Sequence, residues 1–344
     1  MVVYLAGARQ SLPMEITEEH LVFSGPHRRT RGAAQGGDNV VRRGVRLRTD
    51  LLDDQPAWRQ ARRAAEARVL ATALAGPRDV VFAGQSALLL WNVDLWQSNP
   101  DVEVRLPCAE KGPVFPALTI GATTVPAVRQ RQVWWRANGL PEEREGVMAD
   151  SLVDAALIAA LRLAPMQAAV AVAGAMRRLV DYRRHTPQVA TRTAQTRALL
   201  TSHLAERGDR HGQLRARQLV RVVDPACETV GERALHWLLC TLLPQPPSAQ
   251  LEVNAEGRQF FLDLAIPERQ LAIEFDGVSK LGQTPAAFQA AKRDWVERQA
   301  IISRAGWRVL RVAWRDLLAL EQLRRTLRHQ LQLSPTQRGC LPWG

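Results

Sequence analysis

Between residues 260 and 276 the chain alternates apolar and polar side chains with a period of two, which is typical of β-strands. The clearest alternation is Leu271, Ala272, Ile273, Glu274, Phe275 and Asp276. A short polar break, Pro267 to Gln270, separates this run from the strand-like run before it, so the pattern predicts a β-hairpin with a half-buried second strand. If the loop has only these four residues, Ile266 pairs with Leu271, and Asp263 lies opposite Glu274.

The predicted hairpin gathers three carboxylates, those of Asp263, Glu274 and Asp276, on one face. Directly opposed side chains lie roughly 4.5–5.5 Å apart at Cβ, where like charges repel. A divalent cation such as Mg²⁺ relieves this repulsion, because proteins hold it with one or two carboxylates together with water and substrate phosphate. The pattern therefore indicates a metal site, and the alternative is an exposed hairpin face that carries acids without a ligand.

The same periodicity arguments predict elements along the rest of the chain. Helices are expected over 56–75, 84–91, 150–160, 165–180 and 231–243, and strands over 40–48, 101–106 and 121–135. A further strand begins at Leu251. Thr284 and Pro285 suit the start of a helix whose buried side carries Phe288, Trp295 and Ile302. A strand over 307–314 and a helix over 316–331 complete the order αβββαβα, so the predicted fold class is mixed α/β.

A chain of 344 residues has room for about two domains. Residues 1–39 form an irregular basic segment without periodicity. Residues 40–222 form a mostly helical α/β domain, and a boundary near Val223 separates it from a second domain over 223–333. Residues 334–344 are a tail.

The formal net charge of +12 points to a polyanionic partner, most simply DNA. Arginine supplies most of this charge, and codon preference alone can produce an arginine bias, so the excess of base over acid is the stronger argument. Residues 177–221 are the most basic stretch. Its arginines are either phosphate contacts or a solvated helical face. The candidate phosphate contacts are Arg177, Arg178, Arg183, Arg184, Arg215, Arg217, Lys292 and Arg293. The segment over 40–48 alternates apolar and basic residues, which is typical of a short exposed strand that either lies against phosphate or is solvated, and we favour the solvated strand.

The cysteines, Cys108, Cys227, Cys240 and Cys340, are scattered and form no CxxC motif. This spacing argues against a zinc ribbon or a disulfide framework and favours a reducing cytoplasm. The most apolar stretch, 152–176, is interrupted by charged residues and proline, and the N-terminus has no signal-peptide pattern. We expect no membrane span.

Residues 225–325 resemble the very-short-patch-repair endonuclease-like family of the restriction-endonuclease-like PD-(D/E)xK superfamily. The resemblance rests on Gly231-Glu232, Phe261-Leu262-Asp263, Ile273 to Gly277, Lys280, Lys292-Arg293-Asp294, Gly306 to Arg311, and Trp314. It implies a Mg²⁺- or Mn²⁺-dependent nuclease domain. Asp263 would be the main metal ligand, Glu274 and Asp276 would complete the acidic cluster, Glu232 would assist from the neighbouring helix, and Lys280 would approach the phosphate.

The sequence departs from the family pattern in two places. Asp276 replaces the lysine that usually follows the second acid by two residues, and Lys280 is the candidate substitute. Many relatives have histidines directly after the Asp-Gly pair, where this chain has Val278 to Leu281, so a histidine-assisted mechanism is excluded. Glu232 also has a simpler explanation, because a glutamate in the first turn of a helix favours the helix dipole.

Residues 40–180 are similar to the middle of type IV abortive-infection antitoxins, through Arg43-Gly44-Val45, Ser86 to Trp91, and Asp150 to Asp154. Three functions follow as hypotheses. The first is a metal-dependent DNA endonuclease in phage defence or DNA repair. The second is a DNA-binding regulator or antitoxin-like protein with an inactive nuclease fold, for which a cognate toxin or a second copy of the chain is a candidate partner. The third is a protein-interaction module whose charge serves solubility.

Overall fold

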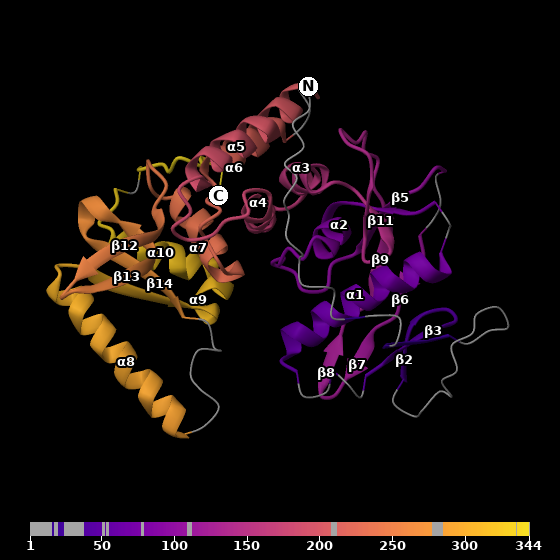
Figure 1. Cartoon of the computed structure of the whole chain (residues 1–344), viewed down its shortest axis with the longest axis horizontal. Helices are drawn as coiled ribbons and strands as arrows, with labels where there is room; N and C mark the ends of the chain where they lie inside the picture. Colours follow the sequence, from indigo (N-terminus) through magenta and orange to yellow (C-terminus); the bar gives the residue numbers. More distant parts are fainter. Residues whose placement is uncertain are drawn as a thin grey trace. The chain divides into compact units, whose positions relative to one another are not determined.

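A computed structural model of the chain describes residues 16, 20–23, 38–49, 52, 55–76, 79–108, 112–207, 212–276, 285–334 and 336–343. It is a mixed α/β protein that divides into two compact units (Figure 1). The first consists of Met1–Leu163 and Ser202–Asp209, and the second of Ala164–Thr201 and Arg210–Gly344. The predicted boundary near Val223 falls inside the second unit. No helix within the described ranges combines the length and apolarity that a bilayer crossing requires.

The first unit is built on a six-stranded sheet of order β10-β11-β4-β5-β9-β6, with a separate three-stranded sheet of order β1-β3-β2 and a β7-β8 hairpin. Its elements are β1 (Leu21–Phe23), β2 (Asp38–Arg42), β3 (Val45–Arg48), α1 (Ala57–Ala75), β4 (Val81–Phe82), α2 (Gly84–Leu90), β5 (Val102–Arg105), β6 (Val114–Phe115), β7 (Leu118–Ile120), β8 (Thr123–Val125), β9 (Val128–Gln132), β10 (Glu142–Arg144), β11 (Val147–Ala149) and α3 (Leu152–Arg162). The helices and strands expected between 56 and 162 are confirmed, with ends shifted by a few residues.

The strand expected over 40–48 is instead a hairpin of β2 and β3, with Gly44 in the turn at φ 80°. The expectation that it is exposed is wrong for three of its apolar positions, because Val41, Val45 and Leu47 are buried, although Val40 is exposed. Alternation places these residues against the core and leaves the arginines between them partly exposed. β1, which lies in the segment expected to be irregular, pairs with β3.

The second unit contains a four-stranded sheet of order β12-β13-β14-β15 in which only the last pair is parallel. Its elements are α4 (Pro165–Leu179), α5 (Val189–Ala205), which ends in the first unit, α6 (Gln213–Val222), α7 (Val230–Cys240), β12 (Ser248–Ala255), β13 (Arg258–Ile266), β14 (Leu271–Asp276), α8 (Pro285–Arg304), β15 (Arg308–Ala313), α9 (Trp314–Leu318) and α10 (Leu320–Gln330). The element order αβββαβα is confirmed from α7 onward, except that the last helix is divided at Ala319 into α9 and α10.

The register predicted for the hairpin is confirmed where the strands pair, but the ladder ends at Leu264 with Ile273 and does not include the expected pair of Asp263 with Glu274. Ile266 pairs with Leu271 across the loop, which is a 3₁₀ turn that ends at Gln270 in the left-handed conformation. The expectation of a half-buried second strand is wrong, since β14 is buried from Leu271 to Phe275 and only Asp276 is exposed.

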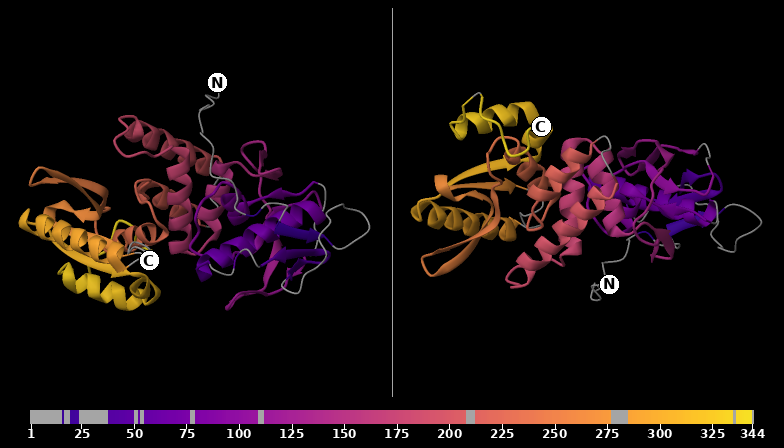
Figure 2. Two further views of the ribbon diagram at one scale, coloured as in Figure 1. Left: turned by 60° about the horizontal axis from the view of Figure 1, so that its bottom comes forward. Right: turned by 90° about the horizontal axis from the view of Figure 1, so that it is seen from above.

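β14 is buried on both faces because helices cover both sides of it. Consecutive residues of a strand point to opposite faces. The side chain of Glu274 contacts α8, and that of Phe275 lies against the start of α7. A Cβ atom at Gly231 would lie 2.1 Å from the Phe275 ring, so α7 can approach the sheet this closely only with glycine there. Figures 1 and 2 show α8 running alongside the sheet.

Candidate functional site

The first predicted metal ligand, Asp263, lies where β13 and β14 stop pairing. The last pair of the ladder on this side is Leu264 with Ile273. One residue further, the Oδ2 atom of Asp263 accepts a hydrogen bond from the backbone N–H of Phe275 at 2.9 Å. The carboxylate thus takes the N–H that a strand partner would otherwise bind, and this contact fixes its position where the strands part.

The second predicted ligand, Glu274, forms a two-point ion pair with Arg298 of α8. Nη1 of Arg298 donates to Oε2 at 2.8 Å, and Nη2 donates to Oε1 at 3.2 Å. Nη2 also donates to the carbonyl oxygen of Phe261 at 2.6 Å, so α8 is bound to two strands through one side chain. Glu274 is only 7% exposed. Both of its carboxylate oxygens therefore interact with a guanidinium group in a place with little water, where such pairs are strong.

The third predicted ligand, Asp276, is exposed at the end of β14 and pairs with Arg311 of β15 at 2.9 Å. The guanidinium of Arg311 lies 3.9 Å from the ring centroid of Trp295, and its other end donates to Gln299. The prediction that Trp295 marks the buried side of α8 is wrong, because the side chain is 40% exposed and forms the outer surface on which Arg311 stacks.

Glu232 is buried in the first turn of α7 and caps that helix. Its Oε1 accepts from the hydroxyl of Thr229, its Oε2 accepts from the N–H of Glu228, and its own N–H donates to the Thr229 hydroxyl. Thr229 is thus the N-cap of α7, and Glu232 in turn accepts hydrogen bonds from the Thr229 hydroxyl and from the backbone of the residue before it. The side chain of Gln250 then joins Oε2 at 3.3 Å. Every contact of Glu232 that we observe serves the helix start or the adjacent strand.

As they stand, these residues do not suit a Mg²⁺ or Mn²⁺ ion. Among the described residues no three His, Cys, Asp or Glu side chains come together as ligands. Glu274 and Asp276 each face an arginine instead, and a cation at either carboxylate would have to displace a positive charge. Lys280 lies outside the described residues.

The predicted phosphate contacts fall into two groups. Arg177 donates to the carbonyls of Pro225 and Ala226 and stacks on Tyr182, and Arg184 donates to Glu228 and Gln250. These two side chains hold the second unit together. Exposure does not separate the two groups: Arg178, Arg183, Arg184 and Arg293 are exposed, and Arg177, Arg215 and Arg217 are intermediate. The side chain of Lys292 is outside the described residues.

The positive groups nearest the acids were not predicted from the sequence. Arg311 and Arg315 line a cleft of about 510 Å³ between β15 and the α9–α10 pair, together with Gln322 and Thr326. A signal for Arg298 does exist, because Arg298, Ile301 and Ile302 have the i, i+3, i+4 spacing of one helix face, and both isoleucines are buried.

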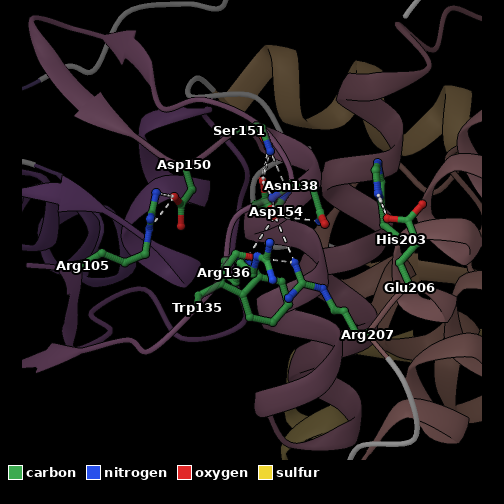
Figure 3. A network of polar contacts seen from close by, with 11 residues as sticks. Arg105, Trp135, Arg136, Asn138, Asp150, Ser151, Asp154, His203, Glu206 and Arg207 are labelled. Carbon is green, nitrogen blue, oxygen red and sulfur yellow. Dashed lines mark hydrogen bonds and ion pairs between the residues drawn. The ribbon is translucent and has the colours of Figure 1, made fainter. Parts of the chain in front are cut away.

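In the first unit the most connected polar group is the fully buried Asp154 (Figure 3). It accepts hydrogen bonds from the Trp135 indole, the Asn138 backbone and the Ser151 hydroxyl. The guanidinium of Arg207 lies 3.6 Å away and stacks over Trp135. Both carboxylate oxygens of Asp154 are occupied by hydrogen bonds from its neighbours, so this network serves the structure.

Asp150 lies near this network and pairs with Arg105 (Figure 3). Its second oxygen, Oδ2, is buried without a hydrogen-bond partner among the described residues. Burial raises the pKa of Asp150 to about 6, against the opposing effect of Arg105. Asp150 therefore binds a proton in the folded state at a pH where an ordinary aspartate has lost it.

No protein-family model, characterised protein or solved structure matches the chain. Its functional interpretation therefore depends on the geometry of its own side chains.

Proposed function

We propose that the protein binds double-stranded DNA through its second unit and does not cut it, with a restriction-endonuclease-like fold over residues 225–325 used for binding. One observation carries this proposal: the carboxylates at the open end of β14 are paired with arginines. Arg298 binds Glu274, and Arg311 binds Asp276. This arrangement presents positive groups where a metal-dependent nuclease requires free acids.

Phosphate binding follows from the same arrangement. Arg315 has an 89% exposed side chain and stands beside Arg311 at the cleft between β15 and α9–α10. A planar guanidinium matches phosphate oxygens with two hydrogen bonds. The exposed Arg178, Arg183 and Arg293 add positive charge to the same unit, and the net charge of +12 supports association with a polyanion.

The test is the salt dependence of affinity for a labelled duplex, measured by fluorescence anisotropy. Binding through phosphates makes log K fall linearly with log salt, by about 0.9 for each phosphate neutralised. The proposal requires such a slope in the wild type and a shallower one in Arg315→Ala. If no binding is detected even at low salt, the protein-interaction hypothesis replaces every nucleic-acid hypothesis.

A second candidate is the Mg²⁺- or Mn²⁺-dependent endonuclease, and the position of Asp263 favours it. The carboxylate lies where β13 and β14 part, with Glu274 and Asp276 on the strand beside it. If the phosphates of bound DNA drew Arg298 and Arg311 away from Glu274 and Asp276, these two carboxylates would become available to a metal ion. Cleavage that requires a divalent cation distinguishes this candidate from the first.

A further inference from the structure

The C-terminal tail is fastened to the end of α7 through its backbone. The N–H of Cys340 donates to the carbonyl of Leu243 at 2.7 Å, and the N–H of Leu341 donates to that of Cys240 at 2.9 Å. A Cβ atom at Gly339 would lie 2.3 Å from the carbonyl oxygen of Cys240. The tail can therefore approach α7 this closely only because residue 339 has no side chain.

This contact brings together two cysteines that are far apart in the sequence. The thiol of Cys340 lies 3.3 Å from the carbonyl oxygen of Cys240, and both thiols are reduced. Cys240 is fully buried, whereas Cys340 is partly exposed. The Cys240 sulfur itself lies 3.6 Å from Nδ1 of His236. The side chain of Cys240 lowers the pKa of Cys340, whereas the side chain of Cys340, together with burial, raises the pKa of Cys240 well above its usual value. The thiol that ionises more readily is thus the accessible one.

We propose that Cys240 and Cys340 form a reversible disulfide when the protein meets hydrogen peroxide. The Cys340 thiolate attacks one peroxide oxygen and the O–O bond breaks, which gives a sulfenic acid and, after protonation, water. The Cys240 sulfur then attacks the Cys340 sulfur. The S–S bond forms as the S–O bond breaks, and the Cys240 proton leaves with the oxygen as a second water. Two thiols are oxidised and one peroxide is reduced, and a thiol reductant reverses the reaction.

The disulfide would close a loop of the chain that runs from Cys240 to Cys340 and contains all the elements from β12 to α10. A disulfide that closes a long loop restricts the unfolded chain strongly, so the oxidised second unit should resist denaturant better than the reduced one. The indole of Trp343 also donates to Gln218 of α6, so the bond would fix a tail that joins α7 to α6. This inference is independent of the DNA-binding proposal.

The test is peroxide treatment of the full chain, followed by non-reducing peptide mapping and intact mass. We expect a mass lower by two hydrogen atoms, one linked pair of peptides containing Cys240 and Cys340, and a higher urea midpoint that dithiothreitol reverses. Cys340→Ser should abolish the link. Cys240→Ala should leave a sulfenic acid at Cys340 that dimedone traps.

Two controls test whether the link depends on the close approach of Cys340 to Cys240 or forms between any reactive cysteines. Gly339→Ala keeps both thiols but displaces the tail, and it should prevent the link. Cys227→Ala should preserve the link, because that cysteine is not one of the two joined by the contact between the tail and α7. Three results would overturn the proposal: oxidation of Cys340 without a link in the wild type, a link that involves Cys227 or the exposed Cys108, or disulfides only between two chains.

Discussion

Arg298 donates to both oxygens of the Glu274 carboxylate, at 2.8 and 3.2 Å, from the helix that covers one face of the four-stranded sheet. The pair joins α8 to the strand that carries two of the three predicted metal ligands. It also explains how an acid can be buried in this sheet, since an unpaired carboxylate there would be costly. We infer that the pair stabilises the fold and, in this arrangement, keeps Glu274 from a metal.

The first prediction concerns the stability that this pair provides. Arg298→Ala leaves a carboxylate buried without its partner, and we expect a loss of about 3 kcal/mol in the free energy of unfolding. The matched control is Glu297→Ala in the neighbouring exposed pair with Arg258, which should cost less than about 1 kcal/mol. Urea titration followed by circular dichroism measures both. Equal losses in the two variants would contradict a structural role for the Glu274 pair.

The two groups of arginines in the basic segment should behave differently. Arg183 is exposed and only loosely paired, at 3.5 Å from Asp181. Arg183→Ala should weaken duplex binding and reduce the salt slope by about 1 without lowering stability. Arg177→Ala removes a charged donor from two carbonyls, and the loss in unfolding free energy should be about 1–3 kcal/mol. Fluorescence anisotropy measures duplex binding and urea titration measures stability for both variants. A loss of stability in Arg183→Ala, with weaker DNA binding but unchanged stability in Arg177→Ala, would contradict the prediction.

Gly231 should be sensitive to a single added methyl group. A Cβ atom there would lie 2.1 Å from the Phe275 ring, so Gly231→Ala must separate α7 from the sheet. We expect a loss of about 1–3 kcal/mol in unfolding free energy. Phe275→Leu in the same chain should recover part of it, so that the double variant loses less than the sum of the single losses. Additive losses would show that the two positions do not interact.

Asp150 should make stability depend on pH in an unusual direction. Burial raises its folded-state pKa to about 6, above that of an unfolded aspartate, so the folded state binds the extra proton. Its contribution is therefore complete below pH ~4 and is lost as pH rises to about 6. Relative to Asp150→Asn, the wild type should lose about 1–3 kcal/mol across that interval. Unfolding titrations at a series of pH values measure this difference, and a constant or rising difference would contradict the assignment.

The order of elements in the second unit could be read from the sequence because its strands alternate clearly and short polar breaks separate them. The four-residue break was sufficient to fix the pairing of Ile266 with Leu271. These are local signals, and strand register depends directly on loop length.

The partners of the acids could not be read in this way. Alternation placed Glu274 and Asp276 on one face, but it did not show which helix covers that face or that arginines would project from α8 and β15. The contact between Cys240 and Cys340 could not be predicted from the sequence either, because a local pattern does not show which distant segments pack together. It joins positions far apart in the chain, and the small size of Gly339 becomes meaningful only when α7 is placed beside it.

The central claim is that the protein binds DNA without cutting it, and a single-turnover cleavage assay tests this most directly. A labelled duplex is incubated with excess protein in Mg²⁺, in Mn²⁺ and with chelator, and each sample is analysed for both binding and strand breaks. We predict a bound but intact duplex under all three conditions. Cleavage that requires the cation and disappears in Asp263→Ala would contradict the claim and establish the endonuclease instead.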